Sequence, residues 1–128
     1  MIVVDTSAIM AILQKEATAA ACMAVIREAD TILMSAGTIA ELLIVAGRRG
    51  IADMADRFVG DLGIEVATVT VRTARQVAAA YERWGKGVHP AGLNLGDCFA
   101  YALAKERACP LLFVGDDFSR TDVLVALS

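Results

Sequence analysis

The chain has 128 residues, a length typical of one domain, and its 12 basic and 15 acidic residues give a net charge of −3. This charge offers nucleic acid no general attraction, so binding to nucleic acid would depend on local basic patches. The longest uncharged stretches, residues 17–26 and 31–40, are too short for the roughly 18 apolar residues of a bilayer-spanning helix, which excludes an integral membrane protein. Residues 1–5 lack the basic region of a secretory signal, so we expect a cytoplasmic protein.

Apolar residues make up 57% of the chain without counting glycine. This fraction exceeds the roughly 45–50% of soluble domains, in which glycine is counted. We therefore expect part of the apolar surface to be covered by self-association or by a partner. Cys22, Cys98 and Cys109 are odd in number and lack CxxC spacing, which predicts buried, reduced thiols.

The first half of the chain alternates short apolar runs with helical segments. Residues 2–4 predict a buried strand that ends at Asp5, and one of residues 5–7 is expected to cap a helix reaching about Leu13. Ser35 is a good cap for a helix that ends before Gly50. The remaining expected helices cover residues 17–28 and 52–62, and the expected strands cover residues 31–34 and 64–69.

The second half continues this alternation. Apolar residues at spacings of three and four, from Ala74 to Trp84, predict an amphipathic helix packed on a core. Residues 85–94 read as a glycine-rich loop, after which Asn94 caps a helix to about Arg107. Strands are expected at residues 111–114 and 123–126. The pattern predicts one α/β domain over residues 1–128, with a mostly parallel sheet of four to five strands flanked by helices.

Acidic residues occur at the ends of these elements. Asp5 and the pair Asp116-Asp117 each follow a predicted strand, at the sheet edge where ligands bind in α/β folds. Asp97 is the third residue of its helix, where a carboxylate also favours the helix dipole. Capping alone would explain Asp5 or Asp97, so each residue taken singly leaves a structural role and a functional role open.

Glu41 is the only charged residue between Ser35 and Val45. A helix that is apolar almost all round is usually buried, and a buried lone carboxylate costs several kcal/mol unless it is paired or bound to metal. Function is therefore favoured, and an ion pair with Arg48 is the structural alternative. Asp116 and Asp117 are adjacent and point opposite ways in an extended segment, so only one is expected to face a shared site.

Gathered carboxylates would repel one another strongly without a cation. Mg²⁺, or alternatively Mn²⁺, suits a site made only of oxygen ligands. Zinc is not expected, because His89 is the only histidine and the cysteines are not clustered.

Four stretches also carry a resemblance to a known family: residues 4–8, Glu41 in the third helix, residues 95–98 and residues 111–118. Together they resemble a PIN-domain ribonuclease, most closely the VapC toxins of bacterial toxin–antitoxin pairs. The resemblance covers the full length and the order of the acidic positions. Residues 89–118 are similar in detail to one VapC subgroup.

The resemblance implies a PIN-like fold and Mg²⁺-dependent hydrolysis of RNA phosphodiester bonds. Asp5 and Asp97 would be the principal metal ligands, and Glu41 with Asp116 or Asp117 would complete the catalytic site. In related sequences the residue before the aspartate that precedes phenylalanine is often asparagine, which favours Asp117. The resemblance further implies a cognate antitoxin that covers the active site, and a homodimer. The identity of the target RNA cannot be read from the sequence.

Basic residues that could contact an RNA backbone occur in two places. One set lies on the polar face of the predicted helix over residues 74–84 and just beyond its ends, where Glu82 interrupts the stripe and favours a merely solvated face. Its members are Arg72, Arg75, Arg83 and Lys86. Arg48 and Arg49 are the alternative.

Two other functions fit parts of the pattern. An aspartate-based phosphatase also begins with a strand and an aspartate, but it needs a second aspartate two residues later, where this chain has Ser7. A non-catalytic antitoxin- or partner-binding module of PIN-like fold would keep the architecture without the reaction. Retention of every acidic position disfavours such a module.

Overall fold

The computed structural model describes residues 1–127, and a parallel sheet of four strands lies at its centre. Across the sheet the strands follow the order β3 (Glu65–Ala67), β2 (Ile32–Ser35), β1 (Ile2–Val4) and β4 (Leu111–Leu112). Because every pair is parallel, the carboxyl ends of β1, β2 and β4 lie at one edge. The strands therefore deliver the residues that follow them to a common place.

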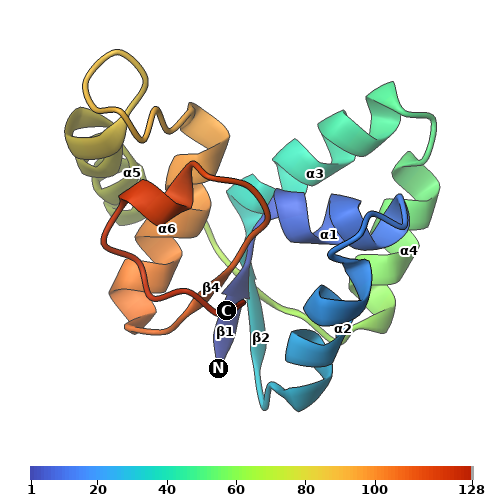
Figure 1. Cartoon of the computed structure of the whole chain (residues 1–128). Coiled ribbons are helices and arrows are strands. Elements are labelled where there is room, and N and C mark those ends of the chain that lie inside the picture. Colours follow the sequence, from blue (N-terminus) through green and yellow to red (C-terminus); the bar gives the residue numbers. More distant parts are fainter. Residues whose placement is uncertain (128) are drawn as a thin grey trace.

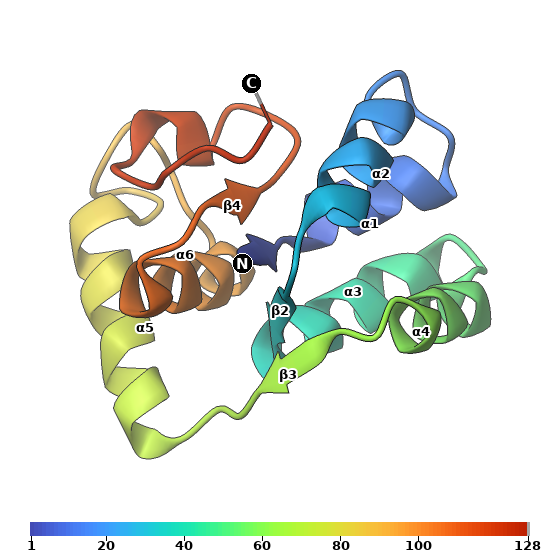
Figure 2. The same ribbon diagram turned by 90° about the horizontal axis from the view of Figure 1, so that it is seen from below.

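Helices cover both faces of the sheet (Figures 1 and 2). One face carries α1 (Thr6–Leu13), α2 (Ala19–Glu28), α3 (Ala36–Arg48) and α4 (Ala52–Asp61). The other carries α5 (Val71–Trp84) and α6 (Leu95–Arg107), with the short 3₁₀ helix η1 (Phe118–Arg120) near them.

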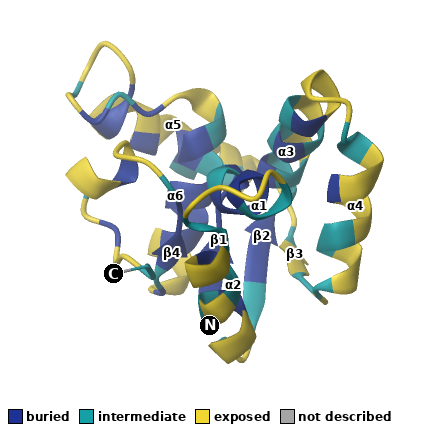
Figure 3. Ribbon diagram, turned by 45° about the vertical axis from the view of Figure 1, so that its right-hand side comes forward, coloured by how far each residue is buried: buried dark blue, intermediate teal, exposed yellow. Residues whose placement is uncertain are grey.

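Side chains of the strands alternate between two hydrophobic cores. Val3, Leu33 and Leu111 belong to the core under α5 and α6, whereas Val4 and Met34 belong to the core under α1 to α4. This alternation is the period of two of a β-strand. Figure 3 shows β1, β2 and β4 largely buried between the two layers, the edge strand β3 largely exposed, and exposed residues on the outer helix faces.

The predicted α/β class and the order of elements are confirmed, with corrections at the ends of some elements. The strand expected at residues 123–126 is wrong, because only an isolated bridge between Leu111 and Val125 forms there. α5 begins at Val71, earlier than its apolar period indicated. The helix starts with a reciprocal capping box between Thr70 and Thr73. Because these residues are polar, the spacing of the apolar residues does not indicate this start.

The apolar stripe of α5 is only partly covered, which corrects the expectation that all of it packs on the core. Val77, Ala80 and Trp84 are buried, but Tyr81 is 38% exposed. The uncovered part lines an apolar groove of about 610 Å³ between α5 and the start of α6. Residues lining this α5–α6 groove include Val69, Ala74, Ala78, Tyr81, Leu95 and Phe99.

The three cysteines are buried and free, as their spacing predicted. Burial raises the pKa of the Cys98 thiol to about 11, which keeps it protonated and unreactive near neutral pH. Within residues 1–127, no helix combines the length and the apolar character needed to cross a bilayer.

A polar chain that begins at buried Trp84 and Tyr101 ties the C-terminal segment to the helices. Trp84 donates its indole N–H to the Tyr101 hydroxyl at 2.8 Å, and that hydroxyl donates to Asp122 at 2.6 Å. Lys105 and Arg83 also approach the Asp122 carboxylate, at 3.2 and 3.5 Å. Asp122 thereby fixes the segment that follows η1 against α5 and α6.

We expect Tyr101→Phe to lower the free energy of unfolding by about 1–3 kcal/mol, because the buried indole N–H of Trp84 would lose its acceptor. Urea unfolding measures the change. Tyr81→Phe is the matched control, since the Tyr81 hydroxyl is exposed and makes only a 3.5 Å contact. Its effect should stay within about 0.5 kcal/mol. Equal losses in both variants would contradict a role for the polar chain.

Candidate acidic active site

The candidate site lies at the carboxyl edge of the sheet, where α1, α3 and α6 begin. A cavity of about 320 Å³ opens there, and Asp5, Glu41 and Asp97 all line it. Asp5 follows β1, Glu41 is one and a half turns into α3, and Asp97 is in the first turn of α6. In Figure 1 α1 and α3 start together at the end of the central strands and then diverge. The fold therefore joins three acidic residues that are far apart in the sequence.

Asp5 is buried, and only one of its two carboxylate oxygens accepts hydrogen bonds. Its Oδ2 caps α1 by accepting from the Ser7 backbone N–H at 3.0 Å and from the Ser7 hydroxyl at 2.6 Å. Ser7 Oγ in turn accepts from the Val114 N–H at 3.0 Å, which couples this cap to the segment after β4. Asp5 Oδ1 has no hydrogen-bond partner among the described residues. Burial is the main cause that raises the Asp5 pKa to about 6, and the Ser7 hydrogen bonds oppose it.

Asp97 combines a cap with a buried charge. Its Oδ2 accepts from the Asn94 N–H at 3.0 Å, and its own N–H donates to Asn94 Oδ1 at 2.8 Å. Burial, followed by the negative charges of Asp5, Glu41 and Asp117, raises the Asp97 pKa to about 7 against the opposing Asn94 hydrogen bond. The four carboxylates therefore act on one another.

Glu41 is held between two helices. Thr6 Oγ1 donates to Glu41 Oε1 at 2.7 Å. On the other side the carboxylate lies against Gly96, where the methyl group of an alanine would overlap it. The expectation of a fully buried lone carboxylate is wrong: Glu41 is half-buried, and the outer face of α3 is open, with Ile44 58% exposed. No ion pair with Arg48 forms among the described residues.

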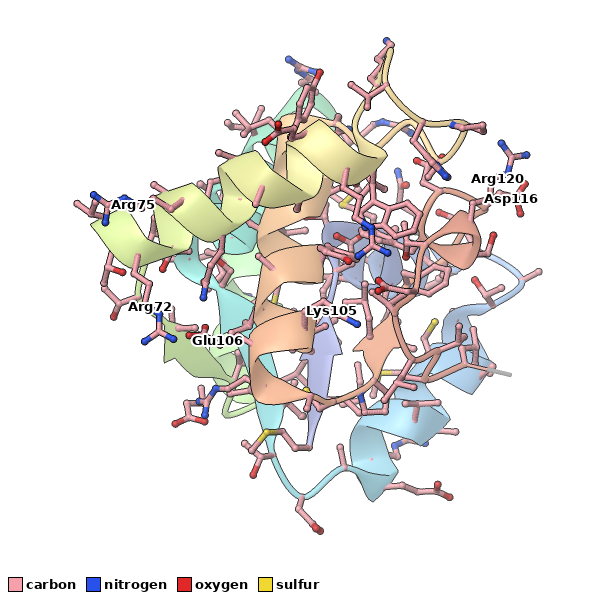
Figure 4. All side chains as sticks on the ribbon, turned by 90° about the vertical axis from the view of Figure 1, so that its left-hand side faces the viewer. Arg72, Arg75, Lys105, Glu106, Asp116 and Arg120 are labelled. Atoms are coloured by element: carbon pink, nitrogen blue, oxygen red, sulfur yellow. The ribbon has the colours of Figure 1, made fainter. Side chains whose placement is uncertain are left out.

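The two aspartates after β4, Asp116 and Asp117, differ in their surroundings. Both carboxylates are exposed, but only Asp117 is among the charges that raise the pKa of Asp97. Asp116 lies beside Arg120 on the outside of the segment in Figure 4. Of the two, Asp117 is therefore the residue whose charge acts on the acidic site.

Two contacts of the site had no clear sequence signal. The Thr6 hydroxyl and the bare Cα of Gly96 both position Glu41, yet a threonine after a strand reads as a cap and a glycine in a first helical turn reads as neutral. Ser7 occupies the place of the second aspartate of an aspartate-based phosphatase. Here its hydroxyl links Asp5 to Val114.

The donors suit a hard cation. They are all oxygens, Asp5 Oδ1 is buried without a partner among residues 1–127, and a cation would offset the burial and the lesser repulsion that raise the pKa values of Asp5 and Asp97. Among residues 1–127, no three His, Cys, Asp or Glu side chains gather closely enough to surround one ion. The residues therefore fit an ion such as Mg²⁺, which takes one or two carboxylates and keeps several waters.

The fold and this acidic edge define a class of protein. The family model described as PIN domain matches residues 2–124. Among curated proteins, the chain is 43% identical to ribonuclease VapC42 of Mycobacterium tuberculosis, covering 94% of this chain and 95% of that protein. It is 44% identical to ribonuclease VapC28 of the same organism, covering 98% and 97%. The chain therefore belongs to the VapC family of PIN-domain proteins, as the resemblance predicted.

Solved structures agree on the fold. A crystal structure of VapC20 from Mycobacterium tuberculosis, a sarcin-ricin loop cleaving toxin, superimposes with a TM-score of 0.77 at 18% identity, covering 97% of each chain. A toxin–antitoxin complex from Klebsiella pneumoniae gives a TM-score of 0.72 at 16% identity, covering 98% of this chain and 96% of that chain. At such identities the likeness concerns architecture alone.

Proposed function

We propose that this protein is a Mg²⁺-dependent endoribonuclease that acts as the toxin of a toxin–antitoxin pair. The observation that carries the proposal is the meeting of Asp5, Glu41, Asp97 and Asp117 at one edge, three of them in one cavity. The curated relatives are named ribonucleases and cover nearly the whole chain, which supports the same activity here. Mn²⁺ is the alternative ion.

The residues of the chain take separate parts in this proposal. Asp5 and Asp97 would hold the ion, which when bound supplies an activated water and positive charge for the phosphate. Ser7 turns one Asp5 oxygen toward the cap and leaves Oδ1 for ligation. Thr6 and Gly96 hold the Glu41 carboxylate beside these two, where it can orient a water. Asp117, exposed at the rim, would orient the attacking water or hold a second ion.

Two protein partners are proposed, a cognate antitoxin and a second copy of the chain. A cognate antitoxin is supported by the toxin–antitoxin complex from Klebsiella pneumoniae, which shares the fold. An arginine of that antitoxin entering the acidic cavity would replace the charge of the cation. The apolar α5–α6 groove supports a homodimer, because a second copy would cover it. Such a ribonuclease would act in the cytoplasm, on cellular RNA.

Two measurements test the proposal: the effect of Mg²⁺ on thermal stability, and the cleavage of RNA. Mg²⁺ should raise the thermal midpoint of the wild type through preferential binding to the folded state, by the equivalent of about 2.7 kcal/mol at a concentration a hundred times the dissociation constant. Calorimetry in Mg²⁺ and in EDTA measures this rise, and a gel assay measures RNA cleavage. An unchanged midpoint in millimolar Mg²⁺ and intact RNA would overturn the proposal.

The adjacent pair provides a sharper comparison. Asp117→Asn should reduce RNA cleavage on the order of a hundredfold, since misplacing a reacting group costs this much. Asp116→Asn removes the same charge one residue away and should change the rate less than about twofold, as expected of a surface substitution. Single-turnover cleavage rates decide between them. A larger loss of cleavage rate in Asp116→Asn than in Asp117→Asn would show that Asp116, and not Asp117, belongs to the site.

A further inference from the structure

The acidic cavity continues as a groove between α1 and α3. Along α1 and its C-cap the lining residues include Thr6, Met10 and Gln14, and along α3 and its C-cap they are Glu41, Val45 and Arg49. Within each set the residues are four apart, so each set forms one stripe along its helix. From Glu41 to Arg49 the α3 stripe extends for about 12 Å at 1.5 Å per residue. The cavity thus has an acidic end and a distal end.

Arg49 lies at the distal end and carries a positive charge, opposite to that of the carboxylates at the acidic end. Among the described residues that line the cavity it is the only basic one. Its side chain is exposed and makes no ion pair with any residue in 1–127. Glu16 lines the same end but lies beyond ion-pair distance of Arg49. The guanidinium is therefore available to an anion lying in the groove.

The basic residues of α5 are not placed for this role. Arg72 pairs with Glu106, and Arg83 pairs with Asp122 and stacks on Trp84. Figure 4 shows Arg72 and Glu106 together on the α5–α6 face, away from Asp116 and the segment after β4. None of the described basic residues of α5 lines the acidic cavity. This outcome agrees with the solvated face that Glu82 favoured.

We propose that Arg49 binds a backbone phosphate of the substrate RNA, beyond the scissile phosphate, so that a single strand lies along the groove from the carboxylates to Arg49. The inference rests on the proposed ribonuclease function and adds a substrate contact to it. A polyanion is repelled by the acidic end, so a positive group in the same cavity offsets that repulsion. Gln14 adds a hydrogen-bonding amide to the lining, beside the apolar walls of Met10 and Val45, which suits a strand that presents both sugar-phosphate and bases.

The test compares Arg49→Ala with Arg48→Ala. Arg48 is the last residue of α3 and Arg49 is its C-cap, so each variant removes one positive charge from the same helix end, but Arg48 does not line the cavity. With a short single-stranded RNA of randomised sequence as the substrate, Arg49→Ala should raise KM roughly three- to fivefold and leave kcat nearly unchanged. Arg48→Ala should match the wild type, and Arg49→Lys should restore most of the KM because it keeps the charge.

Salt dependence provides a second readout that needs neither metal nor turnover. In EDTA, the slope of log affinity for the same RNA against log salt should fall by about 0.7 in Arg49→Ala, the value for one phosphate contact on a single strand. An unchanged slope and KM would overturn the inference while leaving the ribonuclease proposal standing. Failure of the wild type to cleave any RNA would instead overturn the proposed function. Loss of antitoxin binding with unchanged RNA binding would assign Arg49 to a protein interface and also overturn the inference.

Discussion

Asp97→Asn is expected to abolish both RNA cleavage and the Mg²⁺-induced rise of the thermal midpoint. Asparagine keeps the oxygen that accepts from the Asn94 N–H, so the cap of α6 survives while the charge is removed. Loss of a proposed metal ligand should lower the rate by at least about a hundredfold, since groups that merely support ligands cost 10- to 100-fold. The same cleavage and calorimetric assays measure both effects. Equal cleavage by the variant would contradict the metal site.

The same variant should be more stable than the wild type when metal is absent. The Asp97 pKa is raised from 3.8 to about 7, so the folded state binds more protons than the unfolded state between these values. The stability contributed by the neutral carboxyl is therefore fully present below pH 3.8 and is lost as the pH rises through 7. In EDTA at pH 8, Asp97→Asn removes this penalty and should raise the midpoint by roughly 3–6 °C for each kcal/mol relieved.

Asp122→Asn is the control, because the pKa of Asp122 is lowered in the folded state whereas that of Asp97 is raised. The Tyr101 hydrogen bond is the main cause that lowers the Asp122 pKa, so its charged form stabilises the folded state at pH values above its ordinary range. Asp122→Asn should therefore lower the midpoint at pH 8 and have less effect as the pH falls below that range. A lower midpoint for Asp97→Asn in EDTA at pH 8 would contradict the raised Asp97 pKa.

Gly96→Ala is expected to reduce RNA cleavage by at least about tenfold, although alanine is the better helix former. A Cβ at position 96 would overlap the Glu41 carboxylate, so Glu41 or the start of α6 must move. A displacement near 1 Å in a catalytic arrangement costs on the order of a hundredfold, and partial relaxation of the Glu41 side chain would reduce that loss. Single-turnover cleavage rates measure the effect.

Gly60→Ala is the matched control for this substitution. Gly60 also lies in a helix, but a Cβ there meets no atom within 4 Å. Alanine at this exposed position should stabilise α4 by up to about 1 kcal/mol and leave cleavage unchanged. If Gly96→Ala cleaved RNA at the wild-type rate, close contact between Glu41 and Gly96 would not matter for the site.

The parts of the fold that could be predicted are those with local signals. Ser35 and Asn94 each accept a backbone N–H at the start of a helix, as their side chains and positions predicted. The apolar runs at residues 2–4 and 111–112 became adjacent parallel strands. Parallel pairing then brings Asp5 and the segment after β4 to one edge, so the rough location of the site followed from element order alone.

Features that depend on packing between distant segments could not be predicted. The apolar period of α5 does not reveal that Tyr81 stays open, because α6 packs against that helix and covers one side of the stripe. Likewise, the apolar surroundings of Glu41 in the sequence suggested full burial. The carboxylate is only half-buried because it lines the open cavity, between Thr6 and Gly96.

By itself, then, the sequence determined the α/β class, the family and the four acidic positions, because strand period, helix caps and residue order are local properties of the chain. Only the tertiary structure decided that the charge of Asp117 and not that of Asp116 acts on Asp97, that Gly96 makes room for Glu41, and that Arg49 shares the acidic cavity. Each of these depends on the direction of a side chain across a gap between elements. Such directions are set by how helices pack against one another, which no local pattern encodes.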